Sequence, residues 1–599
     1  MDSPKQHEGT AGPDLTEVQQ RLAGAQGRAY WRSLEELAGT EGFREFLQRE
    51  FPSRASEWTN PVTRRRFLHI MGASLALAGL AGCSKSPRQK IVPYRRQPEE
   101  IVQGKPLFYA TAMTVGGYAA GVLVKSLMGR PLKVEGNPDH PASLGATDAF
   151  AQASVLTLYD PDRSRSVRHL GRPSNWTAAL EQLGKLRRDP DRGGAADGVY
   201  LLTESVTSPT LADQLAQLFG DKHSRWHRYQ PCNQDSALEG TALLFGKPRN
   251  AVYRLKDADI VVSLDADFLS CGPGHLAYVH DFAERRRVGD RDAGNMNRLY
   301  VVEATPTSTG LFAEHRLPLP SHQVGAFAAL LAARLADELR GREGVDGEIV
   351  DRLRRLGARG RSEAVAQHEK WAAAVARDLA PKDRDLARAR RGRTLIIPGE
   401  GQPPAVHALA HLMNFALGNV GEKGTVYFTR PVEEWPEEGF RSQHDSFARL
   451  VEAMNAGDVK ALLILGGNPV YNAPADLDFE RALRKVPLRL HLSLYEDETS
   501  RLCHWHIPET HYLETWGDAR AFDGTATIQQ PLIAPLYEGV HSALEVLSAL
   551  EEPRDQPGHE IVRRYWRRHR PRSGSGDFEA FWREALHDGK ITGTALGTE

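Results

Sequence analysis

From residue 198 onward, the chain alternates short apolar strands with helical segments. GVYLLTESVTSP begins the series, and helical patterns follow it over 209–220, 323–340, 403–417 and near 477–485. Apolar strands between helices are typical of parallel sheets that helices cover on both faces. We therefore expect an α/β fold with doubly wound parallel sheets. The later strand segments are ADIVVSLDADFL, RLYVVEATPTSTG, RTLIIPGEGQ, VKALLILGGNPVYNAP and LRLHLSLYEDETS.

Length and charge restrict the function classes. A chain of 599 residues corresponds to roughly four domain-sized units. Its 76 basic and 77 acidic side chains balance, so the total charge does not show the basic excess that is typical of nucleic-acid-binding proteins. Outside 63–83 no apolar run is long enough to span a bilayer. We expect the body of the protein to be soluble on one side of a membrane.

Composition divides the chain into six segments. The stretch PLFYATAMTVGGYAAGVLVKSLMGRPLKVEGNPDHP predicts two strands across a glycine turn and then a loop. The segments are an N-terminal extension (1–62), an export signal (63–83), a proline- and arginine-rich arm (84–105), a β-rich domain (106–170), α/β domains (171–550) with an arginine-rich helical insertion (340–394), and a charged helical tail (551–599).

The segment 63–83, TRRRFLHIMGASLALAGLAGC, has the order of an export signal. Arg64 and Arg65, followed by Phe67 and Leu68, fit the twin-arginine signal of bacteria. The apolar run 70–82 spans about 20 Å, too short to cross a hydrocarbon core of about 30 Å. Leu80-Ala81-Gly82-Cys83 is similar to a lipobox, in which the chain is cut before the cysteine and the sulfur is lipidated. We expect a lipid-anchored protein on the periplasmic face of the cytoplasmic membrane; a buried helix after surface arginines is the alternative.

The signal lies behind a polar extension with an apolar helical face. Trp31, Leu34, Phe43 and Phe46 recur at helical spacing in this extension. Two readings stay open: this face binds an assembly partner before export, or residues 1–62 are a flexible extension.

Polar side chains follow three of the expected strands. Asp265-Ala266-Asp267, Glu303-Ala304-Thr305-Pro306 and Gly466-Gly467-Asn468-Pro469 come directly after apolar runs. Ligands of doubly wound folds bind beyond the carboxyl ends of the strands. Asp265, Glu303 and Asn468 are therefore candidates for a cofactor pocket, although loops of this composition are also common as plain turns.

Several of these segments together resemble a known class. The chain is similar from about 106 to 550 to the molybdopterin oxidoreductases of the dimethyl-sulfoxide-reductase class. The segments 63–83, REFPSRASEW and IVPYRRQPEEIVQGKPLFYAT further resemble the molybdopterin-like B subunits of alternative complex III, a membrane quinol oxidoreductase. The matching segments in the body are KVEGNPDHPASLGATDAF, LTLYDPDRS, VVEATPTST, LGNVGEKGT, LGGNPVYNAP and WHIPETHYLETWGDAR.

The resemblance implies a cofactor that this chain is not equipped to hold. Catalytic relatives bind an iron–sulfur cluster through four cysteines, but no cysteine lies between 84 and 231. Ala146-Thr147-Asp148 stands where the last cluster cysteine is expected, and Glu303-Ala304-Thr305 and Pro320-Ser321-His322-Gln323 replace two nucleotide-binding motifs. We expect no bound molybdenum and no cluster.

Two cysteine-containing segments are metal candidates. Relatives ligate molybdenum from the loop that matches YQPCNQDSALEGTALLFG, which places Cys232, Asp235 or Ser236 near that position; Cys232 as an inert filler is the alternative. CHWHIPETH carries Cys503, His504, His506 and His511. A zinc site needs four well-placed ligands, and this segment corresponds to a strand at the sheet edge in relatives, so we expect a packed or surface role.

The sequence thus favours a non-catalytic, molybdopterin-fold subunit of a membrane quinol:acceptor oxidoreductase, which acts in electron transport. The expected partners are a ferredoxin-like iron–sulfur protein, multi-spanning quinol-binding subunits and cytochrome c subunits. Relatives carry a ferredoxin-like portion where this chain stops at Glu599, so we expect either that the clusters lie on another polypeptide or that the gene is truncated. One alternative is a catalytic molybdopterin oxidoreductase acting on a small oxo or formate-like substrate. Another is a free lipoprotein that binds a nucleotide.

Overall fold

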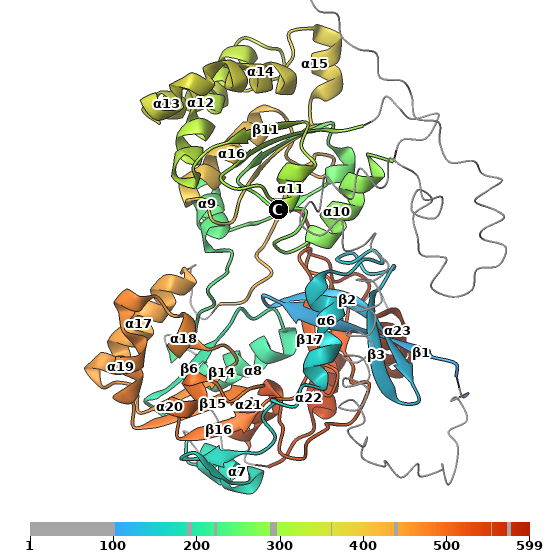
Figure 1. Ribbon diagram of the computed structural model, residues 1–599, viewed down its shortest axis with the longest axis vertical. Coiled ribbons are helices and arrows are strands. Elements are labelled where there is room, and N and C mark those ends of the chain that lie inside the picture. Colours follow the sequence, from blue (N-terminus) through green and yellow to red (C-terminus); the bar gives the residue numbers. More distant parts are fainter. Residues whose placement is uncertain are drawn as a thin grey trace, which may run out of the picture. The chain divides into compact units, whose positions relative to one another are not determined.

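The structure is a computed structural model of the chain (Figure 1). The signal residues Arg64, Arg65, Phe67 and Leu68, the lipidation candidate Cys83 and the apolar face around Trp31 lie outside the residues that it describes. The described residues are Val102 and 104–599, apart from 188–194, 221–224, 288–295, 361, 436–440, 553 and 572–576.

The described chain begins with a three-stranded antiparallel sheet in the order β1-β2-β3. Gly116 and Gly117 form the two-residue turn of its first hairpin, and both have positive φ (57° and 87°), which this type of turn requires. The expectation of a loop after the second strand is wrong for its first part, which is β3. Arg130, Leu132 and Lys133 are all exposed on this edge strand, so its apolar residues do not alternate cleanly with polar ones. The bounds are β1 (Leu107–Val115), β2 (Tyr118–Leu127), β3 (Arg130–Gly136) and the covering helix α6 (Ala149–Leu158).

A parallel sheet of four strands forms the first α/β layer, in the order β11-β10-β9-β12. Alternate residues of β9 enter two different cores: Val262 and Leu264 pack with Phe327, whereas Val261 packs with Phe282. This sheet is therefore buried on both faces, as its continuous apolar strands predict. The bounds are β9 (Ile260–Leu264), β10 (Arg298–Glu303), β11 (His315–Pro318), β12 (Thr394–Pro398), α10 (His275–Glu284), α11 (Ser308–Leu311), α12 (Ser321–Leu339) and α16 (Pro404–Ala416).

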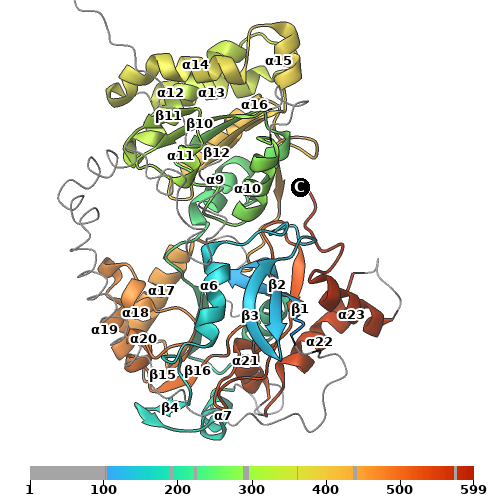
Figure 2. The same ribbon diagram turned by 45° about the vertical axis from the view of Figure 1, so that its right-hand side comes forward.

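The arginine-rich segment 340–394 is helical and extends the core around α12. Leu353 and Val375 are buried against the same cluster as Phe327, and arginines occupy the exposed faces. In Figure 2 these helices lie together with α12. Their bounds are α13 (Gly347–Arg359), α14 (Glu369–Leu379) and α15 (Arg384–Arg390).

A second sheet has seven strands in the order β5-β4-β16-β15-β14-β6-β7. Its strands β6 and β7 precede the four-stranded sheet in the chain and β14–β16 follow it, so the first α/β layer is an insertion in the second. β16 pairs with β15 and with the short β4, so the expectation of an edge strand is wrong. The bounds are β4 (Arg168–His169), β5 (Arg172–Pro173), β6 (Val199–Thr203), β7 (Trp226–Arg228), β14 (Ala461–Leu465), β15 (Leu488–Ser493) and β16 (Trp505–Pro508).

Helices cover both faces of this sheet. One core contains Leu201 and Leu463 with α7, α8 and α21, and the other contains Leu202 and Ile464 with α17 and α19. The bounds are α7 (Trp176–Gly184), α8 (Pro209–Phe219), α17 (Gln443–Ala456), α19 (Phe479–Arg484) and α21 (Ala543–Glu551). Further elements are α9 (Asp235–Phe245), β8 (Asn250–Tyr253), β13 (Val426–Thr429), α18 (Pro469–Asn472) and α20 (Glu498–Leu502).

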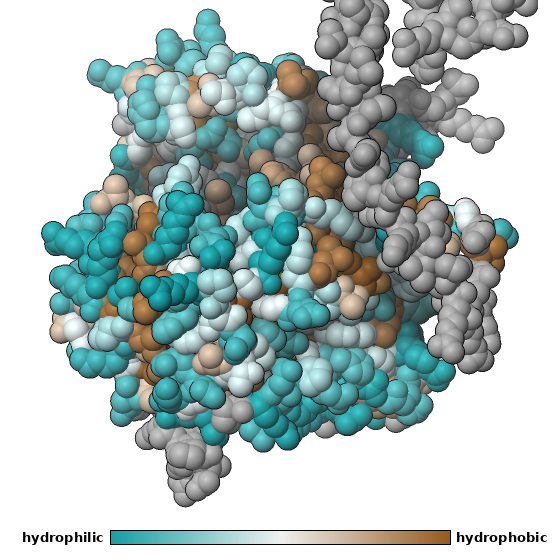
Figure 3. All heavy atoms as spheres, turned by 60° about the horizontal axis from the view of Figure 1, so that its bottom comes forward, coloured by the Kyte–Doolittle hydropathy of each residue, from teal (hydrophilic) through white to brown (hydrophobic). Residues whose placement is uncertain are grey.

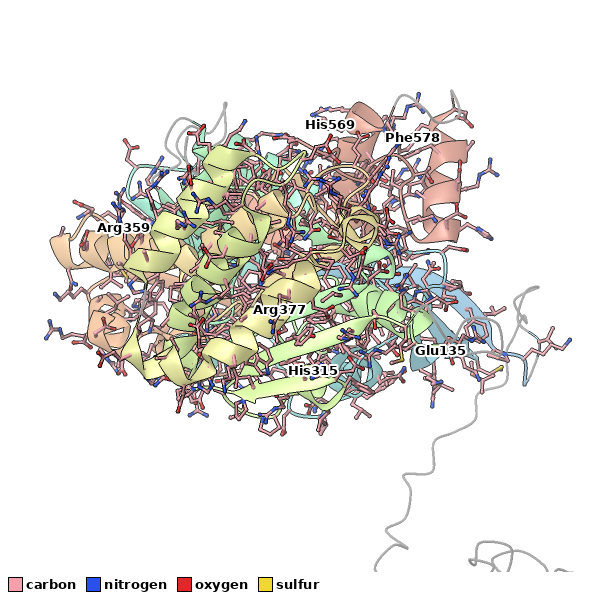
Figure 4. All side chains as sticks on the ribbon, turned by 90° about the horizontal axis from the view of Figure 1, so that it is seen from above. Glu135, His315, Arg359, Arg377, His569 and Phe578 are labelled. Atoms are coloured by element: carbon pink, nitrogen blue, oxygen red, sulfur yellow. The ribbon has the colours of Figure 1, made fainter. Side chains whose placement is uncertain are left out.

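The last helices connect distant parts of the sequence. α23 packs against β1, more than 450 residues earlier in the chain (Figure 2). His569 and Phe578 lie at the facing ends of α22 and α23 in Figure 4, and the guanidinium of Arg567 lies 5.0 Å from the Phe578 ring centroid. The bounds are α22 (Gly558–His569), α23 (Phe578–Asp588), β17 (Gly517–Arg520) and β18 (Ala526–Gln529).

The described surface is largely hydrophilic on the face drawn in Figure 3, where hydrophobic side chains form separate groups. Of the helices that the structure describes, none combines the length and the apolar composition that a membrane crossing requires.

Candidate functional site

Two cavities lie at the carboxyl ends of the parallel strands of the two sheets. The β9 cavity, about 260 Å³, is bounded by the loops after β9 and β12 and by α16. The β6 cavity, about 460 Å³, is bounded by the loops after β6 and β16 and by the β1–β2 turn. Loops at such strand ends are where this class of fold binds ligands.

Asp265 is one of the predicted pocket residues, and it lines the β9 cavity. Its φ of 61° is left-handed, a conformation that aspartate tolerates better than most residues. The carboxylate accepts hydrogen bonds from Ser321 Oγ (2.6 Å) and Gln402 Nε2 (2.8 Å). Neutral donors from α12 and the loop after β12 therefore hold this carboxylate.

Glu303 ends β10 but contributes to neither cavity lining. Its carboxylate pairs with Arg316 of β11 and accepts from Thr307 Oγ1 (2.6 Å), and the residue is 1% exposed. Gly310 packs against the carboxylate so closely that a Cβ has no room. The structure thus gives Glu303 a local structural role at the start of α11.

Asn468 and Cys232 also lie outside both linings. The side-chain oxygen of Asn468 accepts a hydrogen bond from Thr499 Oγ1 (2.8 Å), and its side-chain nitrogen donates one to Glu498 (2.7 Å). Cys232 is exposed in the loop before α9, where its backbone carbonyl accepts from Gln230 Nε2 (2.7 Å). Of the four predicted pocket residues, the structure places only Asp265 in a cavity.

The β6 cavity carries a pair of interacting carboxyl groups that sequence reasoning missed. Burial raises the pKa of Glu509 to about 8, with a further increase from Glu204 and a decrease from Arg163. Burial also raises the pKa of Glu204, whose carboxylate is open to the cavity although protein atoms surround it. No lysine or arginine occurs among the described residues that line this cavity. The cavity therefore favours protonated carboxyl groups or a cation.

Asp148 occupies the place where the resemblance implied a cluster cysteine. Its side chain caps α6 by accepting from the Ala151 N–H (2.7 Å), and its other oxygen lies 3.4 Å from His275 Nε2. The pKa of Asp148 is lowered, first by His275. A capping aspartate paired with a histidine accounts for this position without a cluster.

The segment CHWHIPETH is packed within the second sheet. His506 Nε2 lies 2.6 Å from Ser164 Oγ, and His511 Nε2 lies 3.0 Å from Thr157 Oγ1. Burial raises the pKa of the Cys503 thiol to about 12. Nowhere in the part of the chain that the structure describes do three or more histidine, cysteine or acidic side chains form a group able to hold a metal ion.

The two cavities do not suit an anionic pterin dinucleotide. Arginine, lysine and backbone N–H groups bind a pyrophosphate, and carboxylates repel it. The described lining of the β9 cavity includes three carboxylates (Asp265, Asp267 and Glu400) and one arginine, Arg249, which pairs with Glu599 at 2.5 Å. The β6 cavity carries Glu204, Glu509 and Asp518. The carboxylates of the β9 lining therefore oppose the cofactor that the fold implies, and the described lining of the β6 cavity offers it no lysine or arginine.

Sequence reasoning missed Glu204, Glu400 and Glu509, and also His407 of the β9 cavity. Glu204 and Glu509 each come immediately after a strand, and Glu400 comes two residues after β12. This signal was available in TESV, PETH and PGEGQ, because an acidic residue directly beyond a buried strand points to a strand-end cavity. His407 gave no such signal, because a histidine within an apolar helix is usually a core residue.

Comparisons with known proteins agree with this architecture. No family model matches the chain. The chain is 24% identical over 458 residues to the menaquinone reductase, molybdopterin-binding-like subunit of Nitratidesulfovibrio vulgaris, with 73% of this chain and 64% of that subunit covered. It is 26% identical over 98 residues to the assimilatory nitrate reductase catalytic subunit of Bacillus subtilis, covering 16% of this chain and 13% of that protein. This chain thus spans somewhat less than two thirds of the menaquinone reductase subunit.

Among solved structures, acetylene hydratase from Pelobacter acetylenicus is similar, with a TM-score of 0.55, 13% identity, and coverage of 76% of this chain and 71% of that one. The expectation of a molybdopterin oxidoreductase-like α/β fold is confirmed by this likeness. The chain has the fold of acetylene hydratase, and its sequence is similar to that of a molybdopterin-binding-like subunit of a menaquinone reductase.

Proposed function

We propose that this chain is a non-catalytic subunit of a membrane quinol oxidoreductase, in which the molybdopterin fold serves as a scaffold without molybdenum. The observation that carries the proposal is the acidic lining of the two strand-end cavities, which holds no unpaired lysine or arginine among its described residues. Their carboxylates stand where an anionic cofactor needs cationic or N–H donors. The similarity to a menaquinone reductase subunit supports membership in a quinone-reactive complex.

If this chain is a scaffold, electron transfer is carried out by the other subunits of the complex. An iron–sulfur cluster needs cysteine thiolates, and the described cysteines are Cys232 and Cys271, which are exposed, and Cys503, which is buried. They lie in three different loops and belong to no metal-binding group among the described residues. We infer that a ferredoxin-like iron–sulfur protein, membrane quinol-binding subunits and a cytochrome c subunit complete the complex.

Elemental analysis tests this function. We expect the purified chain to contain no stoichiometric molybdenum or iron and to release no fluorescent pterin on acid oxidation. The acetylene hydratase-like fold alone does not show whether the chain binds a cofactor, because one fold can carry many different functions. Stoichiometric molybdenum with released pterin would instead establish the catalytic molybdopterin oxidoreductase as the function.

We also propose that the chain is exported by the twin-arginine route and anchored through lipid on Cys83. Replacing Arg64 and Arg65 together with lysine is expected to leave the protein in the cytoplasm. Cys83→Ala is expected to leave an uncleaved precursor of higher mass, because the lipidated cysteine defines the cleavage site. Cell fractionation and intact mass measure both outcomes, and Cys232→Ala is the matched control, which should be processed normally. Native protein that still begins at Met1 would contradict the proposal.

A further inference from the structure

The β9 cavity combines an acidic lining with aromatic walls. Its described polar residues include Gln234, Asn250, Asp265, Asp267 and Glu400, and its aromatic residues are Tyr253, Phe268, Tyr278 and Phe522. The cavity is about 260 Å³, enough for a small organic molecule rather than a single water. The acidic and aromatic side chains of this lining together determine which kind of ligand the cavity can bind.

His407 brings a buried nitrogen without a partner to this cavity. The residue is 2% exposed, and its Nε2 has no hydrogen-bond partner among the described residues. Burial lowers the pKa of His407 to about 4, against smaller increases from backbone hydrogen bonds to Gly399 and Gln402. The ring is therefore neutral at pH 7. A neutral ring that donates to a carbonyl from one nitrogen keeps an acceptor lone pair on the other.

His411 repeats the arrangement one helical turn further along α16. It lines the same cavity, is 1% exposed, and its Nδ1 has no partner in the described structure. Burial, with His407 as the second cause, lowers the pKa of His411 to about 3. Buried polar atoms are nearly always hydrogen-bonded in native proteins, so one unpartnered nitrogen on each of these two rings points to a ligand that donates hydrogen bonds to them.

The carboxylates of this cavity accept hydrogen bonds from neutral groups, and His275 lowers the pKa of Glu400 only as the smallest of its causes. Asp267 accepts from the Thr309 N–H (2.9 Å) and Oγ1 (2.7 Å), and Asp265 accepts from a hydroxyl and an amide as described above. Glu400 accepts from Gln234 Nε2 (2.6 Å), and burial raises its pKa. The one lining arginine is already paired with Glu599. The described lining of the cavity thus has more carboxyl groups than cationic side chains, as well as free acceptor atoms.

The geometry points to a binding site for a small planar organic cation that carries N–H donors, such as an amidinium or a guanidinium. Such a group offers paired donors to the carboxylate of Glu400 and the acceptor nitrogen of His407. Gly399, which binds His407, directly precedes Glu400, so both groups open on the same wall. Aromatic faces such as that of Phe522 attract cations further. Anions are repelled by the same lining.

Benzamidine is a suitable probe for the purified full-length chain, with neutral benzamide and anionic benzoate as isosteric controls. Titration calorimetry at pH 7.5 is expected to show benzamidine binding at least tenfold more tightly than benzamide, and benzoate binding not at all. Equal affinity for the three compounds, or no binding of benzamidine, would overturn the inference. Molybdenum content is measured on the same preparation, so this result stays separate from the test of the proposed function.

Two variants locate the site. Glu400→Gln removes the charge and is expected to weaken benzamidine binding at least tenfold, and His407→Phe removes the acceptor and is expected to weaken it severalfold. Glu204→Gln makes the same change in the β6 cavity and should leave the affinity unchanged. Retained affinity in Glu400→Gln would place the ligand elsewhere and contradict the assignment.

A measurement on the unaltered chain avoids any effect of substitution on folding. Cys271 is exposed and lines the β9 cavity, whereas Cys232 is exposed outside it. Saturating benzamidine is expected to slow alkylation of Cys271 by iodoacetamide at least threefold and to leave Cys232 unaffected, as followed by peptide mass spectrometry. Equal rates at Cys271 with and without benzamidine would count against the site.

Discussion

Glu433→Gln is expected to lower the free energy of unfolding by about 3–5 kcal/mol, because it leaves Arg228 as an unpaired buried charge. The side chains of Arg228 and Glu433 are 1% and 2% exposed, and Arg228 Nη1 donates to Glu433 at 2.9 Å. Tyr118 OH (3.0 Å) and Ser205 Oγ (3.1 Å) donate to the same carboxylate. One carboxylate therefore joins β2, β7 and the loop after β6.

Glu434→Gln is the matched control for this prediction. The neighbouring carboxylate lies 3.9 Å from Arg430, with side-chain exposures of 41% and 49%, so water screens the pair. Exposed pairs of this kind contribute about 0–1 kcal/mol. Chemical denaturation of both variants at pH 7 measures the difference. Equal losses of stability in the two variants would show that Glu433 does not hold these elements together.

The sheets were predictable from the sequence because the strands are continuous apolar runs. Residues 260–264 and 461–465 are buried on both faces, which a simple hydrophobic pattern reveals. The strand β3 was not predictable by this pattern, because it is an edge strand in which Leu132 is exposed together with Arg130 and Lys133. Apolar continuity is thus informative for central strands and weak for edges.

The candidate site was predicted only in part. Asp265 could be placed because it directly follows a buried strand, and strand ends of one parallel sheet share an edge. Glu303 likewise stands at the end of an apolar strand, but its carboxylate forms an ion pair with Arg316 of the neighbouring strand. Pairing between strands depends on tertiary register, which local sequence does not specify. The side-chain amide of Asn468 is likewise hydrogen-bonded to Glu498 and Thr499 of α20, a tertiary contact that the local sequence does not specify.

Glu509→Gln is expected to stabilise the protein at alkaline pH, in contrast to most substitutions of charged residues. Burial and the nearby Glu204 raise the pKa of Glu509 to about 8, and Arg163 opposes them. An unfolded glutamate ionises near pH 4.3. Between these values the folded state binds a proton that the unfolded state lacks, so stability falls as the pH rises. The destabilisation is absent below about pH 4 and complete above about pH 8.

The pKa difference corresponds to about 5 kcal/mol at most, since one pKa step equals about 1.4 kcal/mol. Water in the β6 cavity screens part of this energy, and we expect Glu509→Gln to be about 2 kcal/mol more stable than the parent chain at pH 9. At pH 4.5 the two should have nearly equal stability, because glutamine resembles the protonated acid. Urea denaturation at several pH values measures the difference.

Glu514→Gln, five residues further along the chain, is expected to change the free energy of unfolding in the opposite direction. Burial acts against ionisation of Glu514, but hydrogen bonds from Arg163 (2.6 Å for the shorter contact) and from backbone N–H groups lower its pKa overall. A lowered pKa contributes stability above the unfolded value and loses it as the pH falls. Glu514→Gln should therefore destabilise the chain at neutral pH, and this effect should shrink below about pH 4. If both glutamine variants lost stability at pH 9, Glu509 would be a stabilising ionised group, and the acidic character assigned to the β6 cavity would be wrong.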